Sequence, residues 1–190
     1  MKCITCDNLS FQVICKSCQE KLLTPSFHKR EIEEDFYNFS FYPLSEIEDL
    51  ISSKYYFHGD RVFNLLAKLS FAKFAENFNI EDNITAIPID DHTRHEFSHT
   101  AILARHLNCQ NIKPKYNCLK ATNIIKYAGK DLEFRQKNKR RFQLSNLSNE
   151  TTILCDDLIT SGATILEAKK VLEKQNNKVL FSLTLADAKL

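Results

Sequence analysis

The sequence has no long hydrophobic run, no marked excess of charge and only three glycines. Its longest apolar runs are a handful of residues, far short of the roughly 20 that a membrane-spanning helix needs. The first residues, MKCITC, lack the apolar segment of a secretory signal, so we expect a cytoplasmic protein with no membrane span. A formal net charge of +2 does not by itself indicate nucleic-acid binding. What remains is a globular chain of 190 residues, enough for one domain and a small appendage.

Four of the seven cysteines lie in the first 18 residues, in the pattern C-x2-C-x8-C-x2-C. The odd total and the missing signal argue against a disulfide framework. Paired C-x2-C units present thiolates from tight turns and together complete a closed tetrahedral zinc site. The predicted ligands are Cys3, Cys6, Cys15 and Cys18. A redox pair and chance clustering are the alternatives.

A four-thiolate site is structural, and so short a segment would be unfolded without its metal. It could stabilise the N-terminus or dock a partner or nucleic acid, and the sequence leaves this open. Because Pro25 follows a short polar helix, we place a boundary there. The predicted domains are a zinc-binding module, 1–25, and a larger domain, 26–190. Cys155, in an apolar strand, is predicted to be a small buried side chain.

Strands and helices alternate over most of the larger domain. The patterns predict an aromatic strand over 36–44 and a helix capped by Ser45 and Glu48, and then a long helix from Asp60 past Leu69 to Phe74. Further strands are expected at 83–90, 142–144, 152–155 and 179–185. Further helices are expected at 96–107 and 163–174. This order predicts an α/β fold with a largely parallel sheet and right-handed crossovers.

Two pairs of acidic residues stand at predicted strand ends, Asp90/Asp91 and Asp156/Asp157. Open parallel sheets bind ligands beyond the carboxyl ends of their strands. The second pair opens the string DDLITSGAT, which leads into a predicted helix. The N–H groups at that helix start, the hydroxyls of the turn and the permissive backbone of Gly162 together suit a phosphate monoester. The residues concerned are Thr160, Ser161, Gly162, Ala163 and Thr164.

Two carboxylates beside a phosphate site would repel the phosphate, so they should face sugar hydroxyls, Mg²⁺ or both. A diol on one side and a phosphate on the other describe a ribose 5-phosphate. The alternative is an ordinary capping turn between a strand and a helix.

The string TILCDDLITSGATILEA closely resembles the binding motif for 5-phosphoribosyl-1-pyrophosphate (PRPP) of type I phosphoribosyltransferases. The resemblance implies that Asp156 and Asp157 hold the ribose hydroxyls, with Mg²⁺ accompanying PRPP, and that residues 160–164 hold the 5-phosphate. It also implies the phosphoribosyltransferase-like form of the α/β fold.

The order of the whole chain resembles the ComF family, and within it the ComFC type. The shared features are the four-cysteine module, the strand ending IPI, the helix FSHTAILARHL, the R-x-x-N at 135–138 and the PRPP motif. The resemblance implies a role in natural transformation, with single-stranded DNA and other competence proteins as partners.

The region between the strand end and the next helix departs from the family pattern. The candidates for contacts to pyrophosphate, or for a flap that closes over it, are Asp90, Asp91 and Arg94 in this region and Lys130 and Arg135 in the basic segment further along the chain. The basic segment from Lys130 to Arg141, with phenylalanines interleaved, could also be a solvated loop or a track for single-stranded nucleic acid.

Three functions therefore compete. The first is a PRPP-binding, phosphoribosyltransferase-like protein of natural transformation. The second is a phosphoribosyltransferase of nucleobase salvage, which the cysteine module and the basic segment disfavour. The third is a non-enzymatic adaptor that uses the same fold to bind DNA or protein.

Overall fold

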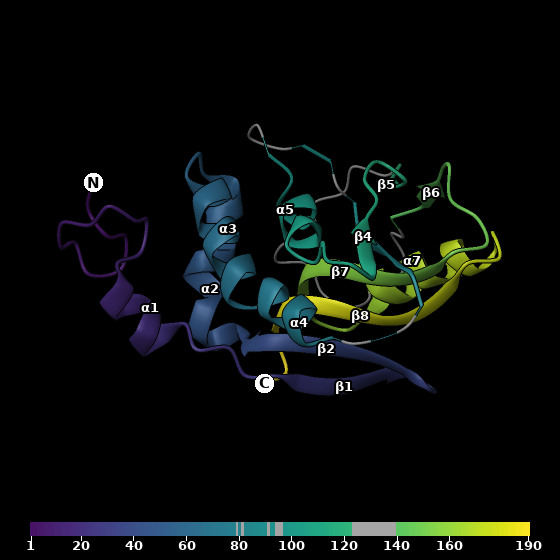
Figure 1. Ribbon diagram of the computed structural model, residues 1–190, viewed down its shortest axis with the longest axis horizontal. Coiled ribbons are helices and arrows are strands. Elements are labelled where there is room, and N and C mark those ends of the chain that lie inside the picture. The colour runs from purple at the N-terminus through teal and green to yellow at the C-terminus, as the bar shows by residue number, and fades with distance from the viewer. Residues whose placement is uncertain (79, 81, 91, 94–96, 123–139) are drawn as a thin grey trace.

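The computed structural model describes residues 1–78, 80, 82–90, 92–93, 97–122 and 140–190. Within these ranges the chain forms strands and helices in alternation (Figure 1). The strands are β1 (His28–Glu33), β2 (Phe36–Pro43), β3 (Ile84–Pro88), β4 (Ile112–Pro114), β5 (Leu119–Ala121), β6 (Phe142–Leu144), β7 (Thr151–Ile159) and β8 (Lys178–Asp187). The helices are α1 (Lys16–Leu22), α2 (Leu44–Ser52), the 3₁₀ turn η1 (Ser53–Tyr55), α3 (Gly59–Leu69), α4 (Phe71–Asn77), α5 (His99–Arg105) and α7 (Ala163–Glu173).

Six strands form the main sheet in the order β1-β2-β8-β7-β3-β4. The β1–β2 hairpin is antiparallel, and every other neighbouring pair in this sheet is parallel. The predicted α/β fold with a largely parallel sheet is therefore confirmed. Strands β5 and β6 form a separate antiparallel pair.

The main sheet is covered on both faces, and its central strand β7 shows this residue by residue. Ile153 and Cys155 belong to an apolar cluster with side chains of α2, α3, α4 and α5. Leu154, which points to the opposite face, belongs to a second cluster with α7 and the β5–β6 pair. Burial on both faces explains why the strand reads as a continuous apolar run rather than as an alternation. The prediction that Cys155 is a buried apolar side chain is confirmed, since it has no exposed surface.

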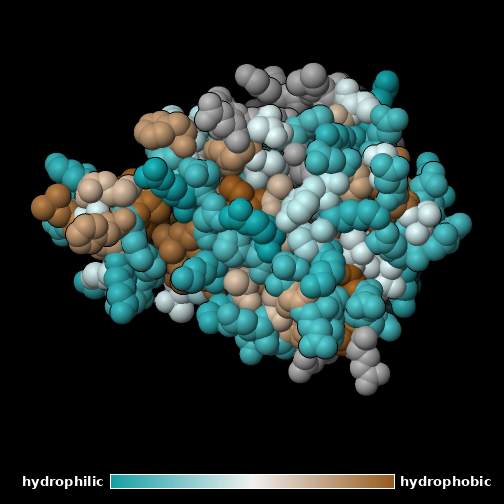
Figure 2. Space-filling model, turned by 45° about the horizontal axis from the view of Figure 1, so that its top comes forward, coloured by the Kyte–Doolittle hydropathy of each residue, from teal (hydrophilic) through white to brown (hydrophobic). Residues whose placement is uncertain are grey.

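The N-terminal module stands at one end of the molecule in Figure 1, and α1 leads from it to the sheet. Its buried residues Val13, Ile14 and Leu23 belong to the same apolar cluster as Tyr42 and Ile47 of the larger unit. Outward, the module exposes large apolar side chains, above all Leu9 and Phe11, and Figure 2 shows this end in the colours of high hydropathy. The domain division at residue 25 stays a prediction.

Several predicted element boundaries were wrong. Residues 28–33, for which no element was predicted, form β1, an edge strand that is largely half-buried and so lacks an apolar signal. The long helix from Asp60 is two helices, because the backbone at Ser70, with φ of −114° and ψ of −74°, departs from regular helical values. Helix α2 begins directly after Pro43, and no side chain caps it, so the predicted Ser45–Glu48 capping box is absent from this described helix.

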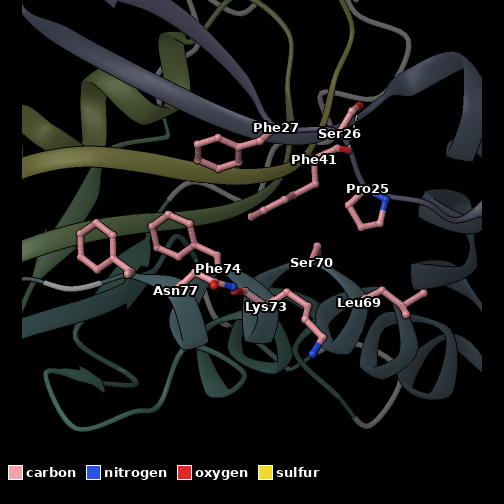
Figure 3. A pocket seen from close by; sticks show the side chains of 10 residues that line it. Pro25, Ser26, Phe27, Phe41, Leu69, Ser70, Lys73, Phe74 and Asn77 are labelled. Carbon is pink, nitrogen blue, oxygen red and sulfur yellow. Dashed lines mark hydrogen bonds between the residues drawn. The ribbon is translucent and has the colours of Figure 1, made fainter.

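An apolar pocket of about 420 Å³ lies between β2 and the α3–α4 pair (Figure 3). Phenylalanines from both sides line it, and Phe27 stacks near Phe74 with 5.8 Å between ring centres. Among the described residues that line it there is no carboxylate, and the one charged side chain, Lys73, is paired with Glu76 at 2.7 Å. This chemistry does not suit a sugar phosphate, so the candidate site lies elsewhere.

No helix in the described part of the chain has both the length and the apolar character needed to cross a bilayer.

Candidate functional site

The acid pair lies inside β7, near its carboxyl end. The sequence predicts that the strand stops at Cys155, but it continues to Ile159 because Asp156 and Leu158 still pair with β8. On its other side, β7 pairs with β3 only as far as Cys155 opposite Pro88. The two carboxylates therefore stand just beyond the end of β3, at the carboxyl edge of the sheet where ligands of open α/β folds bind.

Asp157 is almost fully buried and is contacted by basic side chains from two helical segments. Lys54 of η1 places its Nζ 2.6 Å from Asp157 Oδ2, and His99 of α5 places its Nε2 3.9 Å from the same oxygen. Burial opposes ionisation, but Lys54 and then His99 outweigh it and hold the pKa of Asp157 well below its usual range. Asp157 is thus a fixed negative charge.

Asp156 behaves in the opposite way. Burial, and then the charge of Asp157, raise the pKa of Asp156 well above its usual range, and Arg140 lowers it only in part. The Asp157 N–H donates to Asp156 Oδ1 at 2.9 Å. The two carboxyls titrate as a coupled pair, in which the pKa of Asp156 is raised and the pKa of Asp157 is lowered. A carboxylate accepts hydrogen bonds from hydroxyls and a protonated carboxyl can also donate one, so the pair suits two neighbouring hydroxyls of a diol.

The predicted phosphate-binding segment follows the acid pair in the chain. Gly162 has a φ of 83°, in the left-handed region that favours glycine, and it immediately precedes α7. Ser161 Oγ accepts from the Ala163 N–H at 3.3 Å. A Cβ added to Gly162 would lie 3.4 Å from Ile32 of β1, so the turn packs closely on that strand. The start of α7 offers N–H groups with no partner inside the helix, which suits an anion.

Among the pyrophosphate and flap candidates, the structure describes Asp90. Asp90 is buried and has a left-handed φ of 54°. Its carboxylate accepts from Arg140 Nη1 at 2.9 Å and from the Ala121 N–H at 3.1 Å. Asp90 therefore links the end of β3 to β5 and Arg140. The other candidates, Asp91, Arg94, Lys130 and Arg135, lie outside the described residues.

Lys54 and His99 belong to this site although no sequence pattern pointed to them. Lys54 is 103 residues from Asp157 along the chain and lies in a 3₁₀ turn with no recognisable pattern. His99 belongs to the string FSHTAILARHL, which marks the helix but gives this histidine no role. Cations near the acid pair can be found only from the tertiary structure.

The four predicted zinc ligands lie together in the N-terminal module. All four sulfur atoms lie within 4.8 Å of one another, and Cys6 Sγ is 3.7 Å from Cys15 Sγ. Zn–S bonds of about 2.3 Å in a tetrahedron place sulfurs about 3.8 Å apart, so the spacing fits zinc. A hydrogen bond from the Cys15 N–H is the main cause that lowers the pKa of Cys3 to about 6. Hydrogen bonds with the Cys15 and Cys6 thiols, in contrast, raise the pKa of Cys18 to about 12. Four crowded thiols cannot all ionise without a cation among them.

A magnesium ion is a weaker structural fit at the acid pair. Ligand atoms of His99, Asp156 and Asp157 lie within 4.8 Å of one another. Mg²⁺ prefers oxygen and commonly uses one or two carboxylates together with substrate oxygens, so the two aspartates fit and the imidazole does not. Because Lys54 already neutralises Asp157, Asp156 is the carboxylate better placed to meet a cation carried in by a phosphorylated ligand.

No protein-family model and no curated protein sequence matches the chain. The solved structures that it resembles include a UMP synthase from Leishmania donovani, with 13% identity, a TM-score of 0.40, and coverage of 90% of this chain and 30% of that one. A hypoxanthine phosphoribosyltransferase from Staphylococcus aureus matches with 12% identity, a TM-score of 0.40, and coverage of 66% and 62%. An adenine phosphoribosyltransferase from Saccharomyces cerevisiae, solved with adenine, matches with 20% identity, a TM-score of 0.32, and coverage of 89% of both chains.

This chain thus spans less than two thirds of the first two proteins. Overlaps of this quality assign no role to any residue here. The functional argument rests on the acid pair and the glycine turn themselves.

Proposed function

We propose that the chain is a PRPP-binding, phosphoribosyltransferase-like protein. The observation that supports this best is the combination found along β7 and α7. Two coupled carboxyls at the sheet edge, Asp156 and Asp157, are followed by a left-handed glycine turn at a helix start. Diol recognition and phosphate recognition are thereby offered by one continuous segment, 156–164.

In this proposal the ribose hydroxyls contact the acid pair, and residues 160–164 receive the 5-phosphate. Transfer would displace pyrophosphate from ribose C1 by a nitrogen nucleophile, through a transition state with oxocarbenium character. Such a reaction needs no protein nucleophile, and the chain contributes positioning and charge. Asp156 would help to hold Mg²⁺, and that ion would supply charge neutralisation of the pyrophosphate. Asp90, Asp91, Arg94, Lys130 and Arg135 remain the candidates for the pyrophosphate side.

Calorimetric titration with PRPP and Mg²⁺ tests the proposal. We expect saturable binding by the wild type and a loss of at least about a hundredfold in affinity for Asp156→Ala/Asp157→Ala, since the ribose hydroxyls would lose a hydrogen-bond partner at each carboxyl. Asp49→Ala, a change on α2 away from the pair, is the matched control and should bind as the wild type does. A wild type that shows no binding would contradict the proposal.

Product analysis separates the enzymatic alternatives. Pyrophosphate release with a free nucleobase would favour a salvage phosphoribosyltransferase. PRPP binding without turnover on any base would favour a non-enzymatic adaptor that uses the ligand as a signal.

For the biological role, we propose natural transformation of the ComF type, with single-stranded DNA as a partner. The support is the sequence resemblance together with one surface of the molecule. Arg61, Asn64 and Lys68 lie at helical spacing on α3, and Asn64 Oδ1 accepts from Arg105 Nη2 of α5. Burial, and then the charges of Arg105 and Lys68, lower the pKa of His106, so both cations lie near this imidazole.

The cations Arg61, Lys68 and Arg105 form a basic strip. The exposed aromatic residues Tyr55, Tyr56 and Phe57 come just before α3 in the chain. Cations that follow a phosphate backbone beside rings that stack on bases are typical of single-strand binding. The basic strip on α3 and α5 lies within the described residues. It is an alternative DNA-binding surface to the basic segment predicted from the sequence, most of which lies outside those residues.

Fluorescence anisotropy with a labelled oligothymidylate tests the DNA role. For Arg61→Ala/Lys68→Ala we expect weaker binding and a salt slope reduced by about 1.4, because each phosphate contact to a single strand contributes about 0.7. Lys73→Ala, an exposed lysine on α4, is the control. Identical salt slopes for wild type and double variant would remove this surface from the proposal, and normal transformation in a deletion strain would remove the role.

A further inference from the structure

We propose that Arg30 of β1 is a positioning residue for the phosphate-binding turn. Its guanidinium donates from Nη1 to Asp187 Oδ1 of β8 and from Nη2 to the carbonyl oxygen of Thr160, each at 2.7 Å. One rigid side chain thus joins the edge hairpin, the central strand β8 and the first residue of the turn. The inference deepens the proposed function and rests on it, because it assumes that residues 160–164 hold the 5-phosphate.

The contact to the Thr160 carbonyl sets the direction of a ligand-binding donor. In a trans peptide the carbonyl and the following N–H point in opposite directions, and the described chain has no cis peptide bond. While Arg30 holds the Thr160 oxygen, the Ser161 N–H is directed away from the Arg30 guanidinium. This peptide turns about ψ of Thr160 and φ of Ser161, and the permissive backbone of Gly162, which follows, would let the turn accommodate such a rotation, so the Arg30 contact is what restrains it.

Two further contacts show that β1 supports this whole segment. Ile32, two residues from Arg30, lies against Gly162. Glu33 then pairs with Lys169 of α7 at 2.9 Å. A planar fork is required at position 30, because a lysine would supply a single point of charge and could not hold both oxygens in fixed directions.

Asp187 explains why the guanidinium stays in place. This carboxylate is 1% exposed, and within the described residues its Oδ2 has no hydrogen-bond partner. Its Oδ1 is bonded by Arg30 and by the Lys189 N–H at 2.9 Å. A buried carboxylate with so few partners requires its cation, so Arg30 is held firmly on one side while it supports the turn on the other.

The test compares wild type, Arg30→Lys and Arg30→Met/Asp187→Asn in PRPP titrations. The double variant avoids an unpaired buried charge and protects against simple unfolding. Lys29→Met is the matched control, because it removes an exposed cation from the same strand, where Lys29 lies over the Tyr37 ring and not against the turn. We expect both Arg30 variants to bind PRPP about tenfold more weakly, as for one lost charge-assisted hydrogen bond, and Lys29→Met to bind normally.

Phosphorus NMR of bound PRPP supplies a readout that a purely structural role would not change. The 5-phosphate resonance of the complex should shift in the Arg30 variants, while the pyrophosphate resonances stay where they are. If the wild type binds PRPP, and the Arg30 variants bind it with the same affinity and show the same 5-phosphate resonance, this inference alone is overturned. A wild type that does not bind PRPP would overturn the proposed function, and this inference with it.

Discussion

Removal of two cysteines from the N-terminal cluster is expected to release one zinc ion per chain and to unfold the module. Structural zinc sites in small peptides contribute about 10–16 kcal/mol of apparent binding free energy, which is also folding free energy. The effect should reach the larger unit, because Val13, Ile14 and Leu23 share its apolar cluster. Metal analysis measures the zinc content and thermal melts measure the stability of Cys3→Ser/Cys6→Ser. The wild type, with and without a chelator, is measured beside it.

Cys109→Ser is the control, because this cysteine is half-buried and lies outside the cluster. It should keep its zinc and its melting temperature. Retention of one zinc ion by Cys3→Ser/Cys6→Ser would contradict the site. If the wild type is metal-free and its cluster thiols oxidise reversibly in pairs, the redox alternative replaces the zinc site.

Lys54→Met is expected to give the second-largest effect, a loss of about 3–5 kcal/mol in the free energy of unfolding. Lys54 is the closest cation to Asp157, whose side chain is 7% exposed, and its removal leaves a buried charge without its main partner. Lys73→Met, which breaks an exposed pair with Glu76, should cost at most about 1 kcal/mol. Lys54→Met/Asp157→Asn should recover much of the loss. Urea unfolding at neutral pH gives these values.

The pH dependence of the Lys54 effect has a definite sign. Because the folded pKa of Asp157 lies below its ordinary value of 3.8, the stability that it contributes is present above about pH 4 and is lost as the pH falls further. In Lys54→Met that contribution is gone. The gap between wild type and variant should therefore be widest near pH 7 and narrow below about pH 4. A gap that stays constant across this range would show that Lys54 stabilises the fold by packing instead.

Much of the fold was predictable because its elements carry strong local patterns. The apolar runs that form β3, β7 and β8 are buried on both faces and lack alternation, which is typical of a parallel core. The helix from Ala163 was placed correctly, because Gly162 marks its start. The edge strand β1 was missed because its polar, half-buried residues have no such pattern. The break at Ser70 was missed because a local backbone distortion leaves hydrophobic spacing nearly unchanged.

The chemistry of two segments follows from the sequence alone, since both depend on residues close in the chain. Cys3, Cys6, Cys15 and Cys18 lie within 16 residues, and a tight turn brings each C-x2-C pair together without help from the rest of the fold. The acid pair and the glycine turn are likewise one short stretch, 156–162. Local spacing is therefore sufficient to predict which groups each segment brings together.

The charge state and the support of the 156–162 stretch, in contrast, depend on the tertiary fold. The cation of Asp157 comes from η1, and the anchor of the Thr160 carbonyl comes from β1, 103 and 130 residues away along the chain. Electrostatic coupling depends on distance and burial, and neither is encoded in sequence spacing. Adjacent aspartates look equivalent in the sequence, whereas the fold raises the pKa of Asp156 and lowers the pKa of Asp157.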